Sequence, residues 1–408
     1  MCADGADTMS NGSICVDWCA GAGAQLEVFS PRPSTATSDY SLKYTPPFRS
    51  TIRPPIQELS LGAGELIPIN RNLDTIVQTA RGKTTPAPVA AVGHEGSVKV
   101  VGGQLFSLIV PSYVELDLRE PNLFLEIGVD EALLQYPWEL LHDGDNFLCL
   151  KHYVGRFVNS NSAQVAPNTR NPLATLKGAV EKVSVLLISV PSPLNRDTSR
   201  DANLPPEYKP LDGAREETIE IGNLLAGISC VEVTPLKGPE ATYDNVFQAL
   251  KEKSYHIIHY NGHAYFDDQN PKMSSLVLFD QDMTTGHISK LVGKNPPVLC
   301  FVNACETAMV GKQEAKPNWN NQYNILGLAQ SFLSTGAYLL GSRWRLSDPD
   351  ARKFATGFYT SLLKELNPLG RAVLEARNAC KAAAPDSFAW ASYVFYGDPR
   401  VYFRKLSQ

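Results

Sequence analysis

The sequence lacks the features that mark a membrane-bound, secreted or nucleic-acid-binding protein. No apolar run approaches the roughly 20 residues that a membrane-spanning helix needs. Residues 1–10 have neither the basic start nor the apolar core of a secretory signal. The formal net charge of −5 over 408 residues gives no reason to expect binding to nucleic acid or to a membrane surface. We therefore expect a cytoplasmic protein with no nucleic-acid partner and no membrane partner.

Cysteine is also sparse, which bears on the redox state of the chain. The 8 cysteines are too thinly spread for a disulfide framework, which usually belongs to a much shorter chain. Reduced thiols fit better, and one of them is then available for chemistry. Cys300 lies within an apolar run, so we expect it to be buried. The absence of a Gly-x-Ser-x-Gly elbow and of a complete phosphate-binding Gly-x-x-x-x-Gly-Lys-Ser/Thr loop argues against a serine hydrolase and a nucleotidase.

The most regular pattern in the sequence is an alternation of strands and helices over residues 179–408. The apolar run 183–190 is typical of a strand that is buried on both faces. Further strands are expected at 256–260, 298–302 and 338–340, with helices between and after them at 243–253, 351–363 and 371–383. This alternation predicts an α/β fold with a mostly parallel sheet and helices on both faces.

The N-terminal part of the chain gives weaker signals. Residues 1–90 read either as a flexible arm or as a smaller accessory domain rich in β-structure, with short extended runs at 25–29 and 65–69. Residues 91–178 form a second segment, with helical spacing at 104–114 and an Asn-, Ser- and Thr-rich linker from 159. We therefore divide the chain into 1–90, 91–178 and 179–408.

Two of the predicted strands run directly into polar clusters. The first leads to Gly262, His263 and Ala264, and the second to Ala304 and Cys305. If these strands are neighbours in a parallel sheet, their carboxyl ends meet at one edge, which is where such sheets place their sites. A free thiol is only a few per cent thiolate at neutral pH. An adjacent imidazole raises its reactivity by accepting the thiol proton. We therefore predict Cys305 as nucleophile and His263 as general base. The backbone N–H groups of Ala264 and Cys305 are candidates for an oxyanion hole.

The same motifs resemble those of the CHAT family, caspase-like cysteine peptidases that also resemble separase. Besides Gly-His-Ala at 262–264 and Asn-Ala-Cys-Glu-Thr-Ala at 303–308, the landmarks at 136–141, 210–217, 326–329, 336–348 and 396–399 occur in the family's order. The resemblance covers residues 98–408. It implies a caspase-like peptidase at 179–408, preceded by the upstream half of the CHAT module at 91–178. Ala264 departs from the Gly that many relatives carry, but its backbone donor remains.

The histidines suggest a metal site as an alternative to the cysteine–histidine dyad. His256, His259 and His263 are closely spaced, but alternation along a strand sends His256 and His259 to opposite faces. No His-Glu-x-x-His helix supplies a water-activating centre. We therefore predict neither metal nor organic cofactor, and expect His256 and His259 to be core or supporting residues.

The resemblance to caspase-like folds implies that the segment after the strand at 338–340 lines the substrate pocket. Asp348 would select a basic side chain, Arg343 or Arg345 an acidic one, and Trp344 an apolar one; Asp348 is equally suited to cap the helix that starts near residue 349. The sequence does not decide among these. The stretch 309–322 reads as a surface loop near the site.

The resulting functional expectation is limited proteolysis of a protein partner by a Cys305/His263 dyad. The family resemblance implies a role in bacterial antiviral defence or cell death, with a possible activating protein partner. A catalytically silent scaffold that binds a protein partner, and a different cysteine enzyme acting on small substrates, remain as alternatives.

Overall fold

The computed structural model describes residues 14–18, 23–29, 39–46, 57–60, 93–130, 133, 136–159, 180–194, 210–265, 273–293, 295–305, 332–343 and 346–405. The strands are β1 (Ile14–Trp18), β2 (Gly23–Phe29), β3 (Asp39–Thr45), β4 (Gln57–Ser60), β5 (Phe124–Asp130), β6 (Tyr153–Asn159), β7 (Val183–Ser189), β8 (Val231–Lys237), β9 (Ile257–Tyr265), β10 (Ser275–Val277), β11 (Asp282–Thr284), β12 (Leu299–Cys305), β13 (Tyr338–Ser342), β14 (Tyr393–Tyr396) and β15 (Val401–Lys405). The helices are α2 (Gly93–Ile109), α3 (Ser112–Glu115), α4 (Asp212–Ala226), α5 (Tyr243–Glu252), α6 (Thr285–Val292), α8 (Asp348–Tyr359), α9 (Leu369–Ala383) and α10 (Ala389–Ser392).

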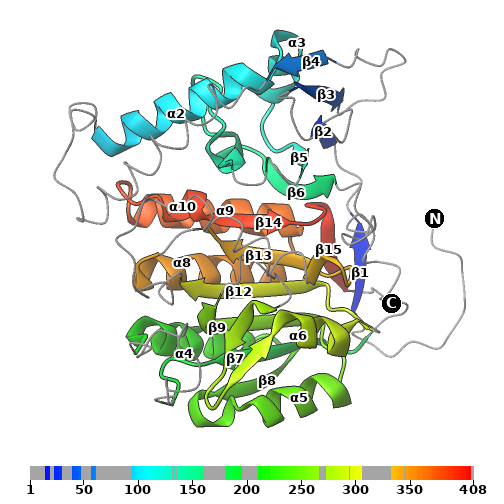
Figure 1. Ribbon diagram of the computed structural model, residues 1–408, viewed down its shortest axis with the longest axis vertical. Coiled ribbons are helices and arrows are strands. Elements are labelled where there is room, and N and C mark those ends of the chain that lie inside the picture. The colour runs from blue at the N-terminus through cyan, green and yellow to red at the C-terminus, as the bar shows by residue number, and fades with distance from the viewer. Residues whose placement is uncertain are drawn as a thin grey trace, which may run out of the picture.

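One large, mostly parallel sheet organises the described part of the chain. Its 13 strands follow the order β11-β10-β9-β12-β13-β14-β6-β5-β2-β3-β4, and β7 joins β8 to the other side of β9. Figure 1 shows these strands stacked along the long axis of the molecule, with β12 near the middle. The pairs β7–β9, β9–β12 and β12–β13 are parallel, as the alternation of strands and helices predicts.

Helices cover both faces of the sheet around β9, and the alternation of side chains along this strand shows which helices lie on which face. His259 and Asn261 contact residues of α4. Ile258, on the opposite face, lines a pocket together with residues of α5 and α6. The predicted α/β fold with a mostly parallel sheet and helices on both faces is therefore confirmed.

The continuous apolar run near residue 183 forms the most deeply buried strand. All seven residues of β7 are buried, and β8 and β9 flank the strand on its two edges. A strand that is covered on both faces needs no polar alternation, so its sequence is mostly apolar, and its two serines, Ser184 and Ser189, are buried as well.

Strands from the N-terminal region extend the same sheet. β2 pairs in parallel with β5, and β3 and β4 continue from β2 to the outer edge. The predicted strand at 25–29 lies within β2, whereas the one at 65–69 lies outside the described residues. β1 pairs separately with β15 near the C-terminus (Figure 1). The boundaries at 90 and 178 stay a prediction, and most of the 159–178 linker also lies outside the described residues.

The helical pattern predicted at 104–114 is divided into two helices. α2 ends at Ile109, and Pro111 stands before the first residue of α3. Proline disfavours a helical conformation in the residue before it, which explains the break. Among the described residues no single helix has the length and apolar character to cross a membrane, although one pair bent by 116°, Gly96–Ile109 with Ser112–Arg119, passes that test together.

Candidate active site

The two strands that carry the predicted dyad are direct neighbours. β9 and β12 run in parallel, and their register pairs Asn261 with Asn303, Gly262 with Ala304, and His263 with Cys305. His263 is buried, and for Cys305 the structure describes the backbone. The sequence predicted a strand that ends at Tyr260. β9 instead continues to Tyr265, because residues 261–263 pair with the last three residues of β12 and residues 264–265 pair with β10.

A buried tyrosine stabilises the backbone of β9 next to His263, and its side chain lies on the face of the strand opposite to that of His263. The hydroxyl of Tyr260 lies within hydrogen-bonding distance of two carbonyl oxygens, that of His263 and, at 2.9 Å, that of Val277 in β10. A Cβ at position 262 would lie 2.7 Å from this hydroxyl oxygen, which is closer than packed atoms tolerate. Only glycine therefore fits at position 262, next to His263, because any side chain there would collide with the Tyr260 hydroxyl.

Two asparagines precede the dyad positions by two residues, one in each strand. Asn303 donates from Nδ2 to both carboxylate oxygens of Glu217 in α4, at 2.8 and 2.9 Å, and its Oδ1 accepts from the hydroxyl of Tyr393 at 3.0 Å. Asn261 donates from Nδ2 to the carbonyl oxygen of Ala214, also in α4, at 3.1 Å. All four side chains that take part are almost fully buried. Two adjacent strands are thus attached to the same helix.

A buried histidine completes this polar group under the sheet. His259 Nδ1 lies 3.0 Å from the hydroxyl of Tyr359 in α8, and its Nε2 lies 3.5 Å from a carboxylate oxygen of Glu217. Burial is the main cause that raises the pKa of Tyr359 well above its usual value, so this hydroxyl stays protonated. The group therefore joins α4 and α8 to β9 through side chains that have no access to solvent.

Comparison with known proteins assigns the chain to a family. The family model named CHAT domain matches residues 99–398, most of the chain. The chain belongs to the CHAT domain family. The resemblance drawn from the motifs at 262–264 and 303–308 is confirmed.

Solved structures place this CHAT domain protein in a known fold. The separase–securin complex of Saccharomyces cerevisiae matches with a TM-score of 0.50 at 12% identity, covering 93% of this chain and 30% of the separase chain. Gingipain R, an Arg-specific cysteine proteinase, matches with a TM-score of 0.44 at 12% identity, covering 84% of this chain and 77% of its own. The likeness to separase shows the fold alone. No curated protein matches the chain.

The oxyanion-hole candidates of the CHAT domain lie at the same end of the sheet. Ala264 is buried and is the register partner of Leu276 in β10, while Cys305 is the last residue of β12. Both positions therefore belong to sheet ladders, and their assignment as oxyanion donors stays a prediction.

Arg343, predicted to bind substrate, is buried against the upstream half of the CHAT domain. Its Nη1 donates to the carbonyl oxygen of Tyr136 at 2.7 Å and lies 4.0 Å from a carboxylate oxygen of Glu139. Arg156 forms an ion pair with the same carboxylate. Burial, reinforced by Arg156, lowers the pKa of Arg343 to about 10, so the guanidinium still carries its charge at neutral pH. This engagement argues against contact between Arg343 and a substrate.

Asp348, the other predicted specificity residue within the described chain, faces α4. Its Oδ2 accepts a hydrogen bond from the backbone N–H of Gly213 at 3.1 Å, in the first turn of that helix. The suggestion that Asp348 caps its own helix is wrong by one residue, because α8 begins at Asp348 and its N-cap is Ser347, which accepts from Asp350 N at 3.3 Å. Trp344 and Arg345 lie outside the described residues, as does the loop 309–322.

The histidines and cysteines that sequence analysis considered occupy separate environments. His256 Nδ1 lies 2.8 Å from the hydroxyl of Ser184 in β7, whereas His259 contacts Tyr359. Across the described residues there is no group of three potential metal ligands. Cys300 is buried as predicted, and burial raises the pKa of its thiol.

Sequence reasoning missed the residues that support the site from below. Glu217 stood at the end of the recognised motif at 210–217 without a role of its own, and Tyr393 carried no assignment. A usable signal exists in the strands themselves, because Asn261 and Asn303 are polar residues in otherwise buried runs and must find partners there. The identity of those partners depends on which helix packs over the strands.

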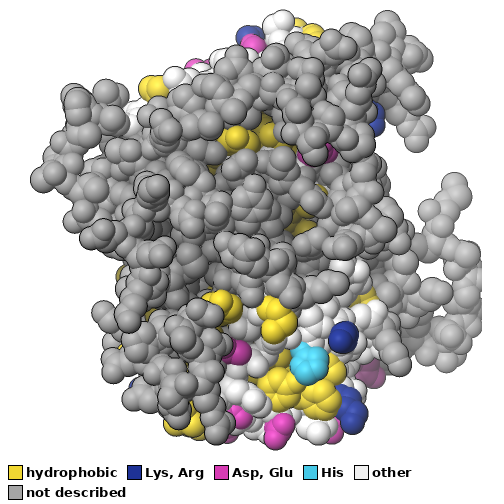
Figure 2. All heavy atoms as spheres, in the orientation of Figure 1, with side chains coloured by type: hydrophobic (Ala, Val, Ile, Leu, Met, Phe, Trp, Pro, Cys, Tyr) yellow, Lys and Arg dark blue, Asp and Glu magenta, His cyan; other side chains and the backbone are white. Residues whose placement is uncertain are grey.

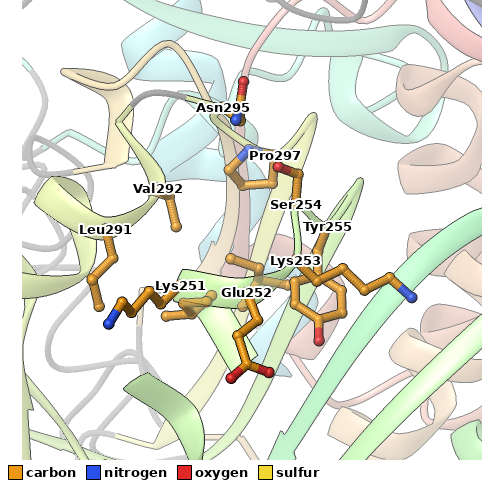
Figure 3. A pocket seen from close by; sticks show the side chains of 11 residues that line it. Lys251, Glu252, Lys253, Ser254, Tyr255, Leu291, Val292, Asn295 and Pro297 are labelled. Atoms are coloured by element: carbon orange, nitrogen blue, oxygen red, sulfur yellow. The ribbon is translucent and has the colours of Figure 1, made fainter. Parts of the chain in front are cut away.

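Other surface features lie away from the dyad. Figure 3 shows a pocket of about 230 Å³ that is lined by Lys253, Tyr255 and Pro297 among others. These residues precede the first residues of β9 and β12, so the pocket lies at the opposite end of β9 from His263. Hydrophobic side chains surround an exposed histidine over α5 and α6 in Figure 2, and His287 Nδ1 lies 2.6 Å from the hydroxyl of Tyr243. Neither feature contacts the predicted dyad.

Proposed function

We propose that this CHAT domain protein is a cysteine endopeptidase with Cys305 as nucleophile and His263 as general base. The observation that supports this most directly is the register of β9 and β12, in which residues 263 and 305 are partners on adjacent parallel strands. Both positions lie at the carboxyl end of their strands, where sheets of this type hold their sites. A histidine and a cysteine in that arrangement provide the nucleophile and base that acyl transfer needs.

The proposed reaction follows the usual course of a cysteine peptidase. His263 takes the proton of the Cys305 thiol, and the thiolate sulfur forms a bond to the peptide carbonyl carbon. The C–N bond then breaks while the imidazolium returns the proton to the leaving amine. Water, deprotonated by His263, hydrolyses the thioester and releases the acid product. Backbone donors at Ala264 and Cys305 would stabilise the oxyanion, a contribution of roughly 3 kcal/mol per donor.

The proposed substrate is a protein that undergoes limited proteolysis in the cytoplasm. Separase was solved in complex with securin, and by analogy a protein partner that controls access or activation is part of the proposal. The role in bacterial antiviral defence or cell death rests on the family resemblance. Because Arg343 is engaged in the core, selection of the substrate side chain falls to the other predicted residues, Trp344, Arg345 and Asp348.

The test is cleavage of a peptide library by wild type and by Cys305→Ala, His263→Ala and Cys300→Ala. Loss of the nucleophile or the base should lower kcat by about 10⁶-fold. Cys300→Ala removes a buried thiol from the same strand and should leave cleavage intact. Equal cleavage by wild type and Cys305→Ala would show that Cys305 is not the nucleophile. No cleavage by wild type, with no labelling of Cys305 by a cysteine-directed electrophile, would favour the silent scaffold.

A further inference from the structure

Helix α4 holds both strands of the predicted dyad at equivalent positions. Asn261 and Asn303 are register partners, and each lies two residues before its dyad residue. Asn261 is attached to Ala214 and Asn303 to Glu217, one helical turn apart on α4. A single rigid element therefore contacts β9 and β12 next to the place where residues 263 and 305 meet.

The contact to β12 is the more specific of the two. The carboxylate of Glu217 accepts from Asn303 with both oxygens, at 2.8 and 2.9 Å, while the hydroxyl of Tyr393 donates to Asn303 Oδ1 at 3.0 Å. An ionised carboxylate accepts hydrogen bonds but cannot donate one. Only one orientation of the Asn303 amide therefore satisfies both Glu217 and Tyr393. Hydrogen bonds to an ionised acceptor are among the stronger ones in proteins. This pair of contacts fixes the side chain of Asn303 and the strand that carries it.

The helix is itself anchored at several points, so it can serve as a fixed reference. Thr218 Oγ1 donates to Ser189 Oγ of β7 at 2.6 Å. Asp348 of α8 accepts from the backbone of Gly213, and Arg352 of α8 pairs with Glu216. The first two turns of α4 are thereby tied to β7, β9, β12 and α8.

We propose that Glu217 is a positioning residue for the dyad, acting through Asn303 to set the place of Cys305 relative to His263. The inference rests on the proposed function in taking these two residues as the dyad. A displacement of about 1 Å between reacting groups costs on the order of 100-fold in rate. Because the thiolate also depends on its imidazole neighbour, loss of the correct distance lowers the intrinsic reactivity of Cys305 at neutral pH.

The experiment measures the rate at which iodoacetamide alkylates Cys305, followed by peptide mapping, in wild type, His263→Ala, Glu217→Gln and Glu220→Gln. Glu220 lies on the exposed side of the same helix, where it pairs with Arg352, so this variant makes the same chemical change away from the site. We expect Glu217→Gln to lower the rate about tenfold at pH 7, towards that of His263→Ala, and Glu220→Gln to leave it unchanged. With peptide substrate, kcat per active site should fall with KM unchanged.

A milder variant covers the case in which Glu217→Gln fails to fold. Tyr393→Phe removes only the hydroxyl that orients Asn303, and it should lower the alkylation rate about threefold. The pH at which the alkylation rate rises should also shift towards the value for an ordinary thiol. Alkylation rates equal to wild type in Glu217→Gln, or in Tyr393→Phe when the first variant does not fold, would overturn the inference. So would a wild-type rate no higher than that of His263→Ala. Absence of peptide cleavage together with slower alkylation of the variants would instead overturn the peptidase function and leave the positioning role intact.

Discussion

Gly213 in the first turn of α4 lies directly against Asp348 of α8: its backbone N–H donates to the Asp348 carboxylate at 3.1 Å, and a Cβ at position 213 would overlap the Asp348 side chain. This hydrogen bond links the N-terminal ends of α4 and α8 beside β9 and β12, the strands of the candidate site. A carboxylate at a helix N-terminus also interacts favourably with the helix dipole. The relationship explains why the motif at 210–217 has glycine at this position.

The first prediction follows from that contact. Gly213→Ala should lower the free energy of unfolding by about 1–3 kcal/mol, because the added methyl forces α4 and α8 apart. Gly222→Ala is the matched control on the same helix. Its Cβ would meet the flexible end of the Lys237 side chain at 3.3 Å and Leu187 Cδ2 at an ordinary contact distance of 3.9 Å, so Gly222→Ala should be neutral or stabilise by up to about 1 kcal/mol. Urea unfolding followed by circular dichroism measures both, and equal effects would contradict the steric explanation.

The second prediction concerns the buried ion cluster. Glu139 compensates two buried guanidinium groups, those of Arg156 and Arg343. Glu139→Gln should lower the free energy of unfolding by about 3–5 kcal/mol, because it leaves these positive charges buried without their carboxylate. The same measurement on Arg343→Met should show a smaller loss, since the Arg156–Glu139 pair remains. A change in peptide preference in Arg343→Met would contradict its assignment to the core.

The third prediction tests the charge of Glu217. Asn303→Asp replaces a donor with a second carboxylate at hydrogen-bonding distance from Glu217, so the two charges repel in a buried place. We expect a loss of about 3 kcal/mol at pH 8. Part of that loss, compared with wild type at the same pH, should be recovered on acidification, because two adjacent buried carboxyl groups can share one proton. The exposed Asn245→Asp, in the first turn of α5, is the control and should show no such recovery on acidification.

The fourth prediction concerns the acid sensitivity of the fold. Burial lowers the pKa of His152 to about 4, while the unfolded chain keeps the ordinary value near 6.5. The unfolded state therefore binds the proton first as the pH falls. The contribution of this histidine is fully present above about pH 6.5 and is lost progressively down to about pH 4. Between pH 7.5 and 5 it should remove about 2 kcal/mol of stability.

His152→Gln isolates that contribution. Glutamine can still donate to the carbonyl oxygen of Leu118, which His152 Nε2 meets at 3.1 Å, but it does not titrate. The loss of stability between pH 7.5 and 5, read from urea unfolding, should be about 2 kcal/mol smaller in this variant than in wild type. Burial also lowers the pKa values of His142 and His256, so some acid sensitivity should remain. An unchanged pH dependence would contradict a neutral His152.

Much of the secondary structure was open to prediction because it depends on local patterns. The apolar run of β7, the amphipathic spacing of α5 and the strand that contains Cys300 all lie where the sequence indicated. The boundaries were less accurate where a tertiary partner decides them. β9 continues to Tyr265 because β12 pairs with it as far as His263 and β10 pairs with Ala264 and Tyr265. α8 gives way at residue 360 to a π-helical turn, Thr360–Lys364, that the helical pattern did not reveal.

The contacts of two predicted specificity residues could not be foreseen for the same reason. The placement of Arg343 after a strand was read correctly, but the direction of its guanidinium depends on Tyr136 and Glu139, which are about 200 residues earlier in the chain. Asp348 stands where the sequence placed it, yet its acceptor oxygen meets Gly213 in another helix. Neither contact can be predicted from the spacing of residues that are close in the sequence.

The sequence by itself determined the family, the alternation of strands and helices, and the presence of a histidine and a cysteine at the carboxyl ends of two strands. Only the tertiary structure decided that these strands are adjacent, that β2 to β4 extend the same sheet, and that Glu217 lies beneath Asn303. Apolar periodicity records which face of an element is buried, and it is the same whichever neighbour buries that face. The choice of neighbour is made by packing and hydrogen bonding between segments far apart in the chain.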